Sequence, residues 1–405
     1  MAQQTAVDTD DLASPGVTAA AGFRASGVTA GLKASGRPDL ALVVNDGPLQ
    51  VGTAVFTTNR VVGAPVVWSR QVVADSTVSA VVLNSGGANV CTGPDGFADV
   101  HRTAEKVADV LGVSAGDVVV ASTGLIGERL PIEKLLAGVD DAAAALHGAG
   151  GPDAATAIMT TDTVAKTAHV TVPGDFGTFT VGGMAKGAGM LAPGLATMLC
   201  VITTDAVVDA DVAADALRTA TRATFDRVDS DGCMSTSDTV ALLVSGASGA
   251  TPDPAGFSAA LTAVCGQLAR QLVADAEGAT HDIAITVVGA ETEDAAVAVG
   301  RAVARSNLFK AAMFGNDPNW GRVLAQVGTV PESVAAFDPD LLDVTINGVQ
   351  VCRAGGAHAP RTEVDLAANR EVHVLIDLHA GAELATIWTN DLTHDYVHEN
   401  SAYST

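Results

Sequence analysis

This sequence predicts a mixed α/β or α+β fold in which sheets are layered against helices. Short β-like apolar runs alternate with longer segments of helical periodicity along most of the chain. Their order lacks the strict β-α-β rhythm of a Rossmann sheet. Hydrophobic residues make up 48% of the 405 residues and aromatic residues only 4%, so we expect a large core built mainly from Ala and Val side chains. That length allows one large domain, or two or three smaller ones.

The expected strands are short β-branched or apolar runs, and several of them alternate apolar and polar residues as half-buried strands do. In chain order they are 39–45, 53–58, 78–83, 117–122, 168–172, 178–182, 197–203, 238–243, 282–288, 342–346, 372–378 and 384–390.

The expected helices show apolar residues at helical spacing. They are 97–111, 131–147, 209–225, 254–276 and 292–313. Pro131 suits the first position of the second helix. The Gly-rich segment 148–152 predicts a linker or turn, and 314–322 predicts a rigid turn anchored by Trp320 whose function stays open.

The strong negative charge of the chain argues against two classes of partner. A formal net charge of −24 opposes binding to nucleic acid, which requires clustered Lys and Arg, and opposes anchoring to anionic lipid. Such acidity suits solubility or a salty cytoplasm, and its field would attract a cationic substrate. No apolar run is long enough for a membrane helix, and the first residues lack the pattern of a signal peptide, so we expect a cytoplasmic protein.

No familiar metal or nucleotide motif is present. The five cysteines are scattered without a C-x-x-C pair, and the nine histidines show no H-E-x-x-H spacing, so neither disulfides nor a metal site is expected. The sequence also lacks a P-loop, G-x-G-x-x-G and the G-x-S-x-G elbow. The acidic turn 229–238 resembles a calcium loop, but Arg227 would occupy the first ligand position. We therefore interpret this turn as structural support.

The most informative segment is Lys186–Cys200, a Gly-rich and nearly uncharged run with one Lys at its head. A small residue followed by a hydroxyl residue at the start of a strand, here Ala196 and Thr197, suits self-cleavage by an N→O acyl shift. Cleavage would give Thr197 a free α-amine, with a reference pKa of about 7.7–8.0, beside its own hydroxyl. On spacing alone, a buried loop that leads into a core strand is the more common explanation of such a run.

The chain resembles the ornithine acetyltransferase family, also called glutamate N-acetyltransferase or the arginine biosynthesis bifunctional protein family. Family members carry a similar Lys-Gly-small-Gly-Met…Ala-Thr-Met-Leu run and are cut before the Thr. Further segments that look like family motifs, in family order, are 84–89, 122–127, 159–162, 229–238, 275–278, 314–322 and 399–403. Together they span nearly the whole chain.

The resemblance implies a four-layer α-β-β-α sandwich of the N-terminal-nucleophile style, with a smaller lobe formed by roughly the last third. It also implies a cut that separates residues 1–196 from 197–405, with Thr197 as nucleophile and Thr123 and Gly124 as the oxyanion hole. The implied substrate-binding residues are Thr160, Lys186, Thr197, Glu277, Asn400 and Thr405.

Elementary chemistry is compatible with these roles and also with plainer ones. Thr123 and Gly124 follow a Val-rich strand, where a free backbone N–H could face a ligand, but an ordinary strand-to-helix turn would look the same. Lys186 could bind a carboxylate or be a solvated loop residue. Glu277 could pair with an ammonium group or simply end the 254–276 helix.

The activity implied by the resemblance is transfer of acetyl from N2-acetyl-L-ornithine to L-glutamate in a ping-pong cycle, with no cofactor. The resemblance also implies an α2β2 assembly of the two fragments, and it leaves open whether acetyl-CoA serves as a second donor. Three alternatives stay open. They are an amidohydrolase or aminopeptidase on the same scaffold, an acetyltransferase of secondary metabolism, and a binding protein without catalysis.

Overall fold

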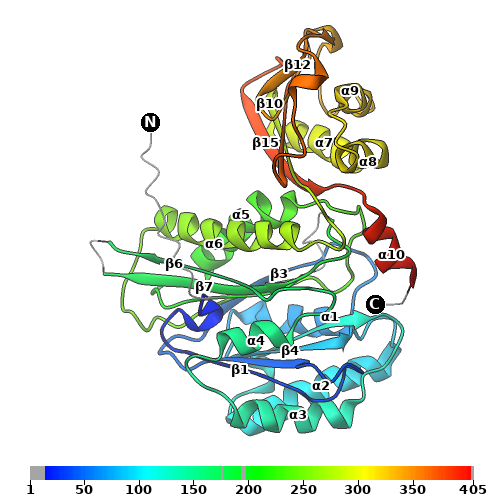
Figure 1. The fold of residues 1–405 in the computed structure, drawn as a ribbon. Helices are drawn as coiled ribbons and strands as arrows, with labels where there is room; N and C mark the ends of the chain where they lie inside the picture. Colours follow the sequence, from blue (N-terminus) through cyan, green and yellow to red (C-terminus); the bar gives the residue numbers. More distant parts are fainter. Residues whose placement is uncertain (1–13, 175–176, 193–197, 403–405) are drawn as a thin grey trace.

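The computed structural model describes residues 14–174, 177–192 and 198–402. Two sheets lie face to face in the body of the molecule, each covered on its outer side by helices, and a third sheet forms a lobe above them (Figure 1). This arrangement confirms the predicted four-layer sandwich with a smaller C-terminal lobe. None of the helices in the described part of the chain has the length and apolar character that crossing a membrane requires.

The first sheet has the order β1-β2-β4-β5, in which only the β4–β5 pair is parallel. Its outer face is covered by α2 and α3, and α1 and α4 lie beside its edge strands. The Trp68 indole and the Ser69 hydroxyl of α1 bond to backbone groups of β5. The bounds are β1 (Phe23–Val28), β2 (Leu40–Asn45), β4 (Ala80–Gly87), β5 (Val118–Leu125), α1 (Ala64–Val72), α2 (Gly93–Leu111), α3 (Ile132–Ala144) and α4 (Gly151–Ala157).

The second sheet has the order β3-β9-β8-β7-β6 and is covered by α5 and α6. Successive residues of its central strands enter different cores: Val201 packs between the two sheets, and Cys200 and Ile202 pack under the helices. Burial on both faces explains why these strands are nearly continuous apolar runs. The bounds are β3 (Val51–Phe56), β6 (Lys166–Val172), β7 (Phe179–Lys186), β8 (Leu199–Thr204), β9 (Thr239–Val244), α5 (Ala210–Ala223) and α6 (Pro254–Ala274).

The C-terminal lobe has a sheet of order β13-β12-β11-β14-β10-β15 and its own apolar core. After β15, the last helix α10 returns to the body (Figure 1). The bounds are β10 (Asp282–Ala290), β11 (Asp343–Ile346), β12 (Val349–Arg353), β13 (Gly356–Ala357), β14 (Glu371–Asp377), β15 (Glu383–Asn390), α7 (Glu293–Ala304), α8 (Asn307–Phe314), α9 (Trp320–Val327) and α10 (His394–Ala402). Short 3-10 turns are η1 (Gly16–Thr18), η2 (Val73–Asp75), η3 (Ala115–Asp117), η4 (Phe225–Arg227), η5 (Pro339–Leu341) and η6 (Arg361–Glu363).

Several local expectations differ from the structure. The helix expected over 292–313 is interrupted, because Ser306 leaves the helix and its hydroxyl caps α8 by accepting from the N–H of Phe309. The segment expected to be a turn at 148–152 already enters α4, with Pro152 in its first turn. The sequence did not predict strands β1, β12 and β13 or helices α1 and α9. The strand expected over 197–203 begins at Leu199; Met198 precedes it, and Thr197 lies outside the described residues.

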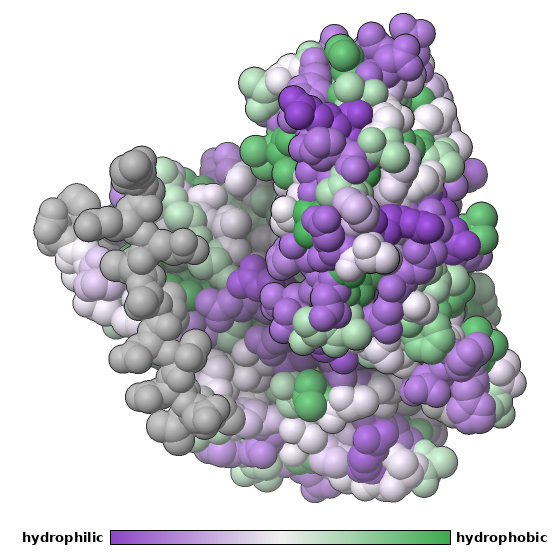
Figure 2. Space-filling view, turned by 45° about the horizontal axis from the view of Figure 1, so that its top comes forward, coloured by the Kyte–Doolittle hydropathy of each residue, from purple (hydrophilic) through white to green (hydrophobic). Residues whose placement is uncertain are grey.

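Figure 2 shows that the surface is hollowed where the C-terminal lobe rises from the sandwich, and that hydrophilic residues gather around the hollow.

Candidate active site

A cavity of about 160 Å³ lies where the ends of β5 and β7 meet the loop after α4, the loop after α6, and α10. All the predicted site residues that lie in the described part of the chain line it. Ala196, Thr197 and Thr405 lie outside the described residues. The lining residues are Thr123, Gly124, Thr160, Thr161, Lys186, Gly189, Met190, Asp231, Cys233, Glu277, Tyr396 and Asn400.

Thr123 and Gly124 belong to the last part of β5 and do not form a strand-to-helix turn. The parallel ladder places Thr123 opposite Ser85 and Gly124 opposite Gly86. Gly124 has φ +129°, and a Cβ there would lie 2.6 Å from the carbonyl carbon of Gly86. Only glycine fits this close approach, which leaves the backbone of Gly124 at the wall of the cavity.

Lys186 is the last residue of β7 and is only 2% exposed, so the solvated-loop interpretation of this residue is wrong. Its Nζ donates to Oγ1 of Thr123 at 3.3 Å and lies 4.0 Å from Oδ2 of Asp162. Burial lowers the pKa of Lys186, and the charge of Asp162 opposes that shift. The ammonium group is therefore held directly beside the predicted oxyanion-hole threonine.

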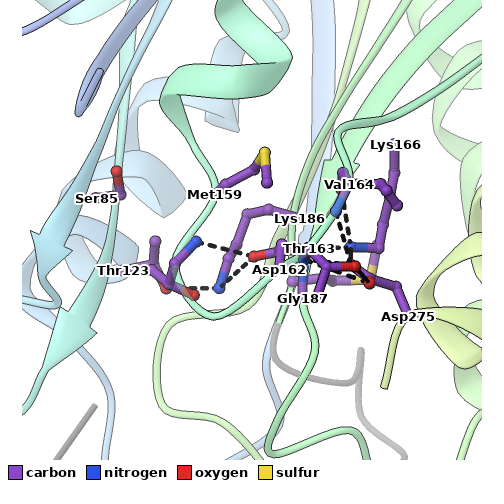
Figure 3. Close-up of polar contacts among 12 residues, drawn as sticks. Ser85, Thr123, Met159, Asp162, Thr163, Val164, Lys166, Lys186, Gly187 and Asp275 are labelled. Carbon is purple, nitrogen blue, oxygen red and sulfur yellow. Dashed lines mark hydrogen bonds and ion pairs between the residues drawn. The ribbon is translucent and has the colours of Figure 1, made fainter. Parts of the chain in front are cut away.

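Asp162 connects the cation of Lys186 to the surrounding loops (Figure 3). Its Oδ1 accepts from the N–H of Gly187 at 2.6 Å and from Nζ of Lys166 at 2.6 Å. Its Oδ2 accepts from the N–H of Thr160 at 2.9 Å. Burial disfavours the charged carboxylate, but the ammonium groups of Lys186 and Lys166 outweigh it and hold the pKa of Asp162 well below its usual range.

Lys166 extends this network to the end of α6. Its side chain is fully buried and pairs with Asp275 as well as with Asp162. Asp275 also accepts from the backbone N–H of Thr163 at 3.0 Å. Because Asp275 lies just before Glu277, the network fixes the loop that carries Glu277 relative to the loop that carries Thr160.

Glu277 also lines this cavity. Its backbone N–H donates to the carbonyl of Ala188 at 3.0 Å, and its Oε2 accepts from Nδ2 of Asn400 at 2.9 Å. A Cβ at Gly189 would lie 2.6 Å from Oε1 of Glu277, so the glycine leaves room for the carboxylate. Asn400 comes from α10, the last helix of the described chain.

Sequence reasoning missed two functional candidates that the structure places at the cavity. Asp231 accepts from the N–H of Met190 at 2.7 Å and from the N–H of Cys233 at 3.1 Å, and its burial raises its pKa. Burial, with the nearby carboxylates Asp231 and Glu277, raises the pKa of Tyr396 to about 12. Asp231 lies in the acidic turn 229–238, so its motif was visible but interpreted as structural support. Tyr396 had no sequence signal.

The lining of the cavity therefore carries charges of both signs. Lys186 supplies a cation, and Glu277 and Asp231 supply carboxyl groups. A small molecule that carries both a carboxylate and an ammonium group would find a partner for each. A zwitterionic amino acid is the kind of ligand that this arrangement suits.

Asp238 lies close to the predicted cleavage point and is fully buried. Its Oδ1 accepts from the N–H of Met198 at 2.9 Å, and its Oδ2 has no hydrogen-bond partner within the described ranges. Burial raises its pKa well above the ordinary value, which favours the neutral acid. The backbone directly after Thr197 is thus held by a carboxyl group.

Comparison with known proteins adds a second line of evidence. The model of the ArgJ family matches residues 24–405. Proteins named arginine biosynthesis bifunctional protein ArgJ from Streptomyces avermitilis and Streptomyces coelicolor are 64% and 63% identical over 388 residues, covering 96% of this chain and 99% of each relative. The crystal structure of an ornithine acetyltransferase complexed with ornithine from Mycobacterium tuberculosis is 55% identical, with a TM-score of 0.42, and the match covers 45% of this chain and 96% of that one.

Proposed function

Because this chain belongs to the ArgJ family, we propose that it transfers the acetyl group of N2-acetyl-L-ornithine to L-glutamate in arginine biosynthesis. The observation that carries this proposal is the convergence of Thr123, Gly124, Thr160, Lys186, Glu277 and Asn400 on one cavity whose lining carries charges of both signs. These residues lie far apart in the sequence, and they are the residues that the family resemblance implies for a single site.

In the proposed reaction the chain first cuts itself between Ala196 and Thr197. The α-amine of Thr197 then takes the proton of its own hydroxyl, and the oxygen attacks the acetyl carbonyl. Thr123 and Gly124 stabilise the oxyanion of the tetrahedral intermediate. The C–N bond breaks, the ornithine nitrogen leaves with a proton, and the acetyl group stays on Thr197 as an ester.

The second half of the proposed cycle reverses these steps with glutamate. The α-amine of glutamate attacks the ester carbonyl, Thr197 leaves as the alcohol, and N-acetylglutamate departs. Lys186 is suited to bind the substrate carboxylate, and Glu277 is suited to bind the side-chain ammonium of ornithine. Asn400 supports Glu277 through its 2.9 Å hydrogen bond.

We also propose that the fragments 1–196 and 197–405 stay together after the cut and assemble as α2β2. The antiparallel ladder between β7 and β8 supports their association, because it pairs Val181–Lys186 with Leu199–Thr204 across the cut. The name "bifunctional" carried by the relatives supports a second acetyl donor, for which we propose acetyl-CoA. All five cysteines are free, which suits a reducing cytoplasm.

The intact mass of the purified protein, before and after mixing with N-acetylornithine, tests the proposal. We expect two fragments that begin at Met1 and Thr197, and one acetyl group on the second fragment after mixing. Glutamate should remove that group and release N-acetylglutamate. A single chain that never gains acetyl would contradict the proposal, and acetyl loss to water at the same rate without glutamate would indicate a hydrolase.

Replacing Thr123 with alanine should slow acetyl transfer by about 10²–10³-fold in kcat, because one preorganised oxyanion donor is lost. Self-cleavage should also slow if one oxyanion hole serves both steps. Thr171→Ala is the control, since Thr171 is an exposed residue of β6 outside the cavity. Single-turnover acetylation and the rate of fragment appearance measure the two effects. Wild-type rates in Thr123→Ala would remove Thr123 from the oxyanion hole.

Replacing Glu277 with glutamine should raise the KM for N-acetylornithine by about tenfold or more, while kcat changes less. The substitution keeps the shape and the acceptor for Asn400 but removes the charge that pairs with ammonium. Steady-state kinetics with Glu383→Gln, an exposed residue of the C-terminal lobe, give the control. A KM equal to that of the wild type would place the ammonium group elsewhere.

A further inference from the structure

A second cavity, of about 700 Å³, lies where α1, β3 and α5 of the sandwich meet α7 of the C-terminal lobe. It adjoins the candidate active site along the chain, because Met234 lines this cavity while the preceding residue Cys233 lines the first one. Nothing in the proposed acetyl transfer uses its residues. We call it the arginine cavity, after its lining residues Arg70, Arg218, Arg222, Arg227, Arg301 and Arg305.

The concentration of arginine here contrasts with the rest of the chain. The lining contains six of the 22 Lys and Arg residues of a protein whose net charge is −24. Only two carboxylates, Asp226 and Asp294, line the same cavity. Carboxylates bind some of the guanidinium groups: Asp215 binds Arg218, Asp294 and Glu293 bind Arg222, Glu293 also binds Arg227, and Asp229 binds Arg305. Each guanidinium has five N–H donors, so these pairs leave many donors unused.

The two most enclosed arginines carry unused donors. Arg227 is only 5% exposed and uses Nη2 on Glu293 and Nε on the carbonyl of Arg222. Its Nη1 is buried and has no hydrogen-bond partner in the described part of the chain. Arg301 donates from Nη2 to the carbonyl of Asp226 at 2.7 Å, and its buried Nε likewise has no partner there. Buried charged donors are rarely left unpaired in native proteins. We therefore expect a ligand to supply an acceptor for these two N–H groups.

Arg70 adds a donor from the other wall. It lies over the ring of Phe56, with 5.7 Å from the guanidinium carbon to the ring centroid, and donates from Nη2 to the carbonyl of Thr57. It has no ion pair with a described carboxylate. Planar guanidinium groups bind phosphate oxygens in pairs, and several of them from different elements match a ligand with more than one anionic group. The cavity is also large enough for more than a single phosphate.

We propose that the arginine cavity binds a diphosphate group. The diphosphate could belong to a free diphosphate compound or to a nucleotide-bearing acyl donor such as coenzyme A, and both present the same chemistry to the guanidinium groups. The link to coenzyme A rests on the proposed acetyl-transfer function, but diphosphate binding itself does not.

Calorimetric titration of the full-length wild-type protein with inorganic diphosphate at low ionic strength tests the site. We expect saturable binding that weakens with added salt. Arg301→Gln and Arg70→Gln should each weaken it by about tenfold or more, because a charge-assisted donor is lost. The matched control is Arg102→Gln on α2, an exposed arginine paired with Glu133 and remote from the cavity lining. Arg227→Gln is included only if its thermal unfolding matches that of the wild type.

Competition identifies the source of the diphosphate. If coenzyme A displaces diphosphate while pantetheine does not, and Arg301→Gln raises the KM for acetyl-CoA but not for N-acetylornithine, the ligand is the acyl donor. If diphosphate binds and coenzyme A does not compete, the ligand is a free diphosphate compound. Both results support the site, and the binding of diphosphate and its competition with coenzyme A are measured without any acetyl transfer.

Four results would overturn the inference. Three are the absence of saturable diphosphate binding by the wild type, equal binding by the folded Arg301→Gln and Arg70→Gln variants, and equally tight binding of sulfate. The fourth is a change of subunit assembly in these variants without any diphosphate binding, which would make the arginine cavity an interface between copies of the chain.

Discussion

Replacing Thr197 with alanine is expected to give one uncut chain and to lower acetyl transfer by at least about 10⁴-fold. The substitution removes the oxygen that would attack the carbonyl of Ala196 and, after the cut, the acetyl carbonyl. Because cleavage also creates the α-amine, both the nucleophile and its base are lost together. Electrophoresis and intact mass measure cleavage, and a coupled assay of N-acetylglutamate formation measures transfer.

Thr197→Ser separates loss of chemistry from loss of fold. Serine keeps a hydroxyl at the same position, so we expect slower but detectable cleavage and one acetyl group on the second fragment. The uncut Thr197→Ala chain should keep a wild-type circular dichroism spectrum, because the β7–β8 ladder forms on either side of this position. Two fragments from Thr197→Ala would show that another residue performs the cut.

Replacing Asp162 with asparagine should have the second-largest effect. It leaves the buried ammonium groups of Lys166 and Lys186 with one carboxylate fewer. Breaking a buried charge pair by removing one partner costs about 3–5 kcal/mol of unfolding free energy. Transfer should also fall, since Asp162 positions Lys186 and the backbone of Thr160 at the cavity.

The pH dependence gives this prediction a definite sign. The Asp162 charge favours the protonated form of Lys186, so its loss should lower the pKa of Lys186 further. The alkaline limb of the kcat/KM profile should therefore move to lower pH. The other charged groups that act on Lys186 are Lys166, Asp238 and Glu277, with Lys33 nearby. They are the same in both proteins and cannot produce the difference.

The contribution of Asp162 to the free energy of unfolding should depend on pH in the acid range. The pKa of Asp162 is lower in the folded protein than in the unfolded chain, so its contribution is fully present above the unfolded value of about 3.9. That contribution is lost as the pH falls through the unfolded value toward the folded one. The stability difference between wild type and Asp162→Asn, measured by urea unfolding, should accordingly shrink below about pH 4.

Asp275→Asn is the matched control, because Asp275 also binds the ammonium of Lys166 but makes no contact with Lys186. Both variants should be less stable than the wild type. Only Asp162→Asn should move the alkaline limb of the kcat/KM profile. Equal shifts in the two variants would mean that Asp162 acts on activity through general stability alone.

Much of the architecture followed from local pattern. The runs around 199–204 and 239–244 are continuous apolar segments, and the structure confirms them as β8 and β9, which pack against a core on each face. Prediction from local pattern failed where one residue changes the backbone. Ser306 caps α8 and so interrupts the helix predicted over 292–313, although the helical periodicity continues through it. Prediction failed again at α10, whose polar sequence carries little periodicity.

The sequence by itself determined the family motifs, the point predicted for self-cleavage and the residues predicted to form the site. Only the tertiary structure decided that Lys186 is buried beside Thr123, that Asp162 holds it there, and that Asp231 and Glu277 line the same cavity. The arginine cavity also appears only in three dimensions, since its residues come from α1, α5, η4 and α7. Burial and charge pairing depend on which distant segments the chain brings together, and local periodicity carries no information about those distances.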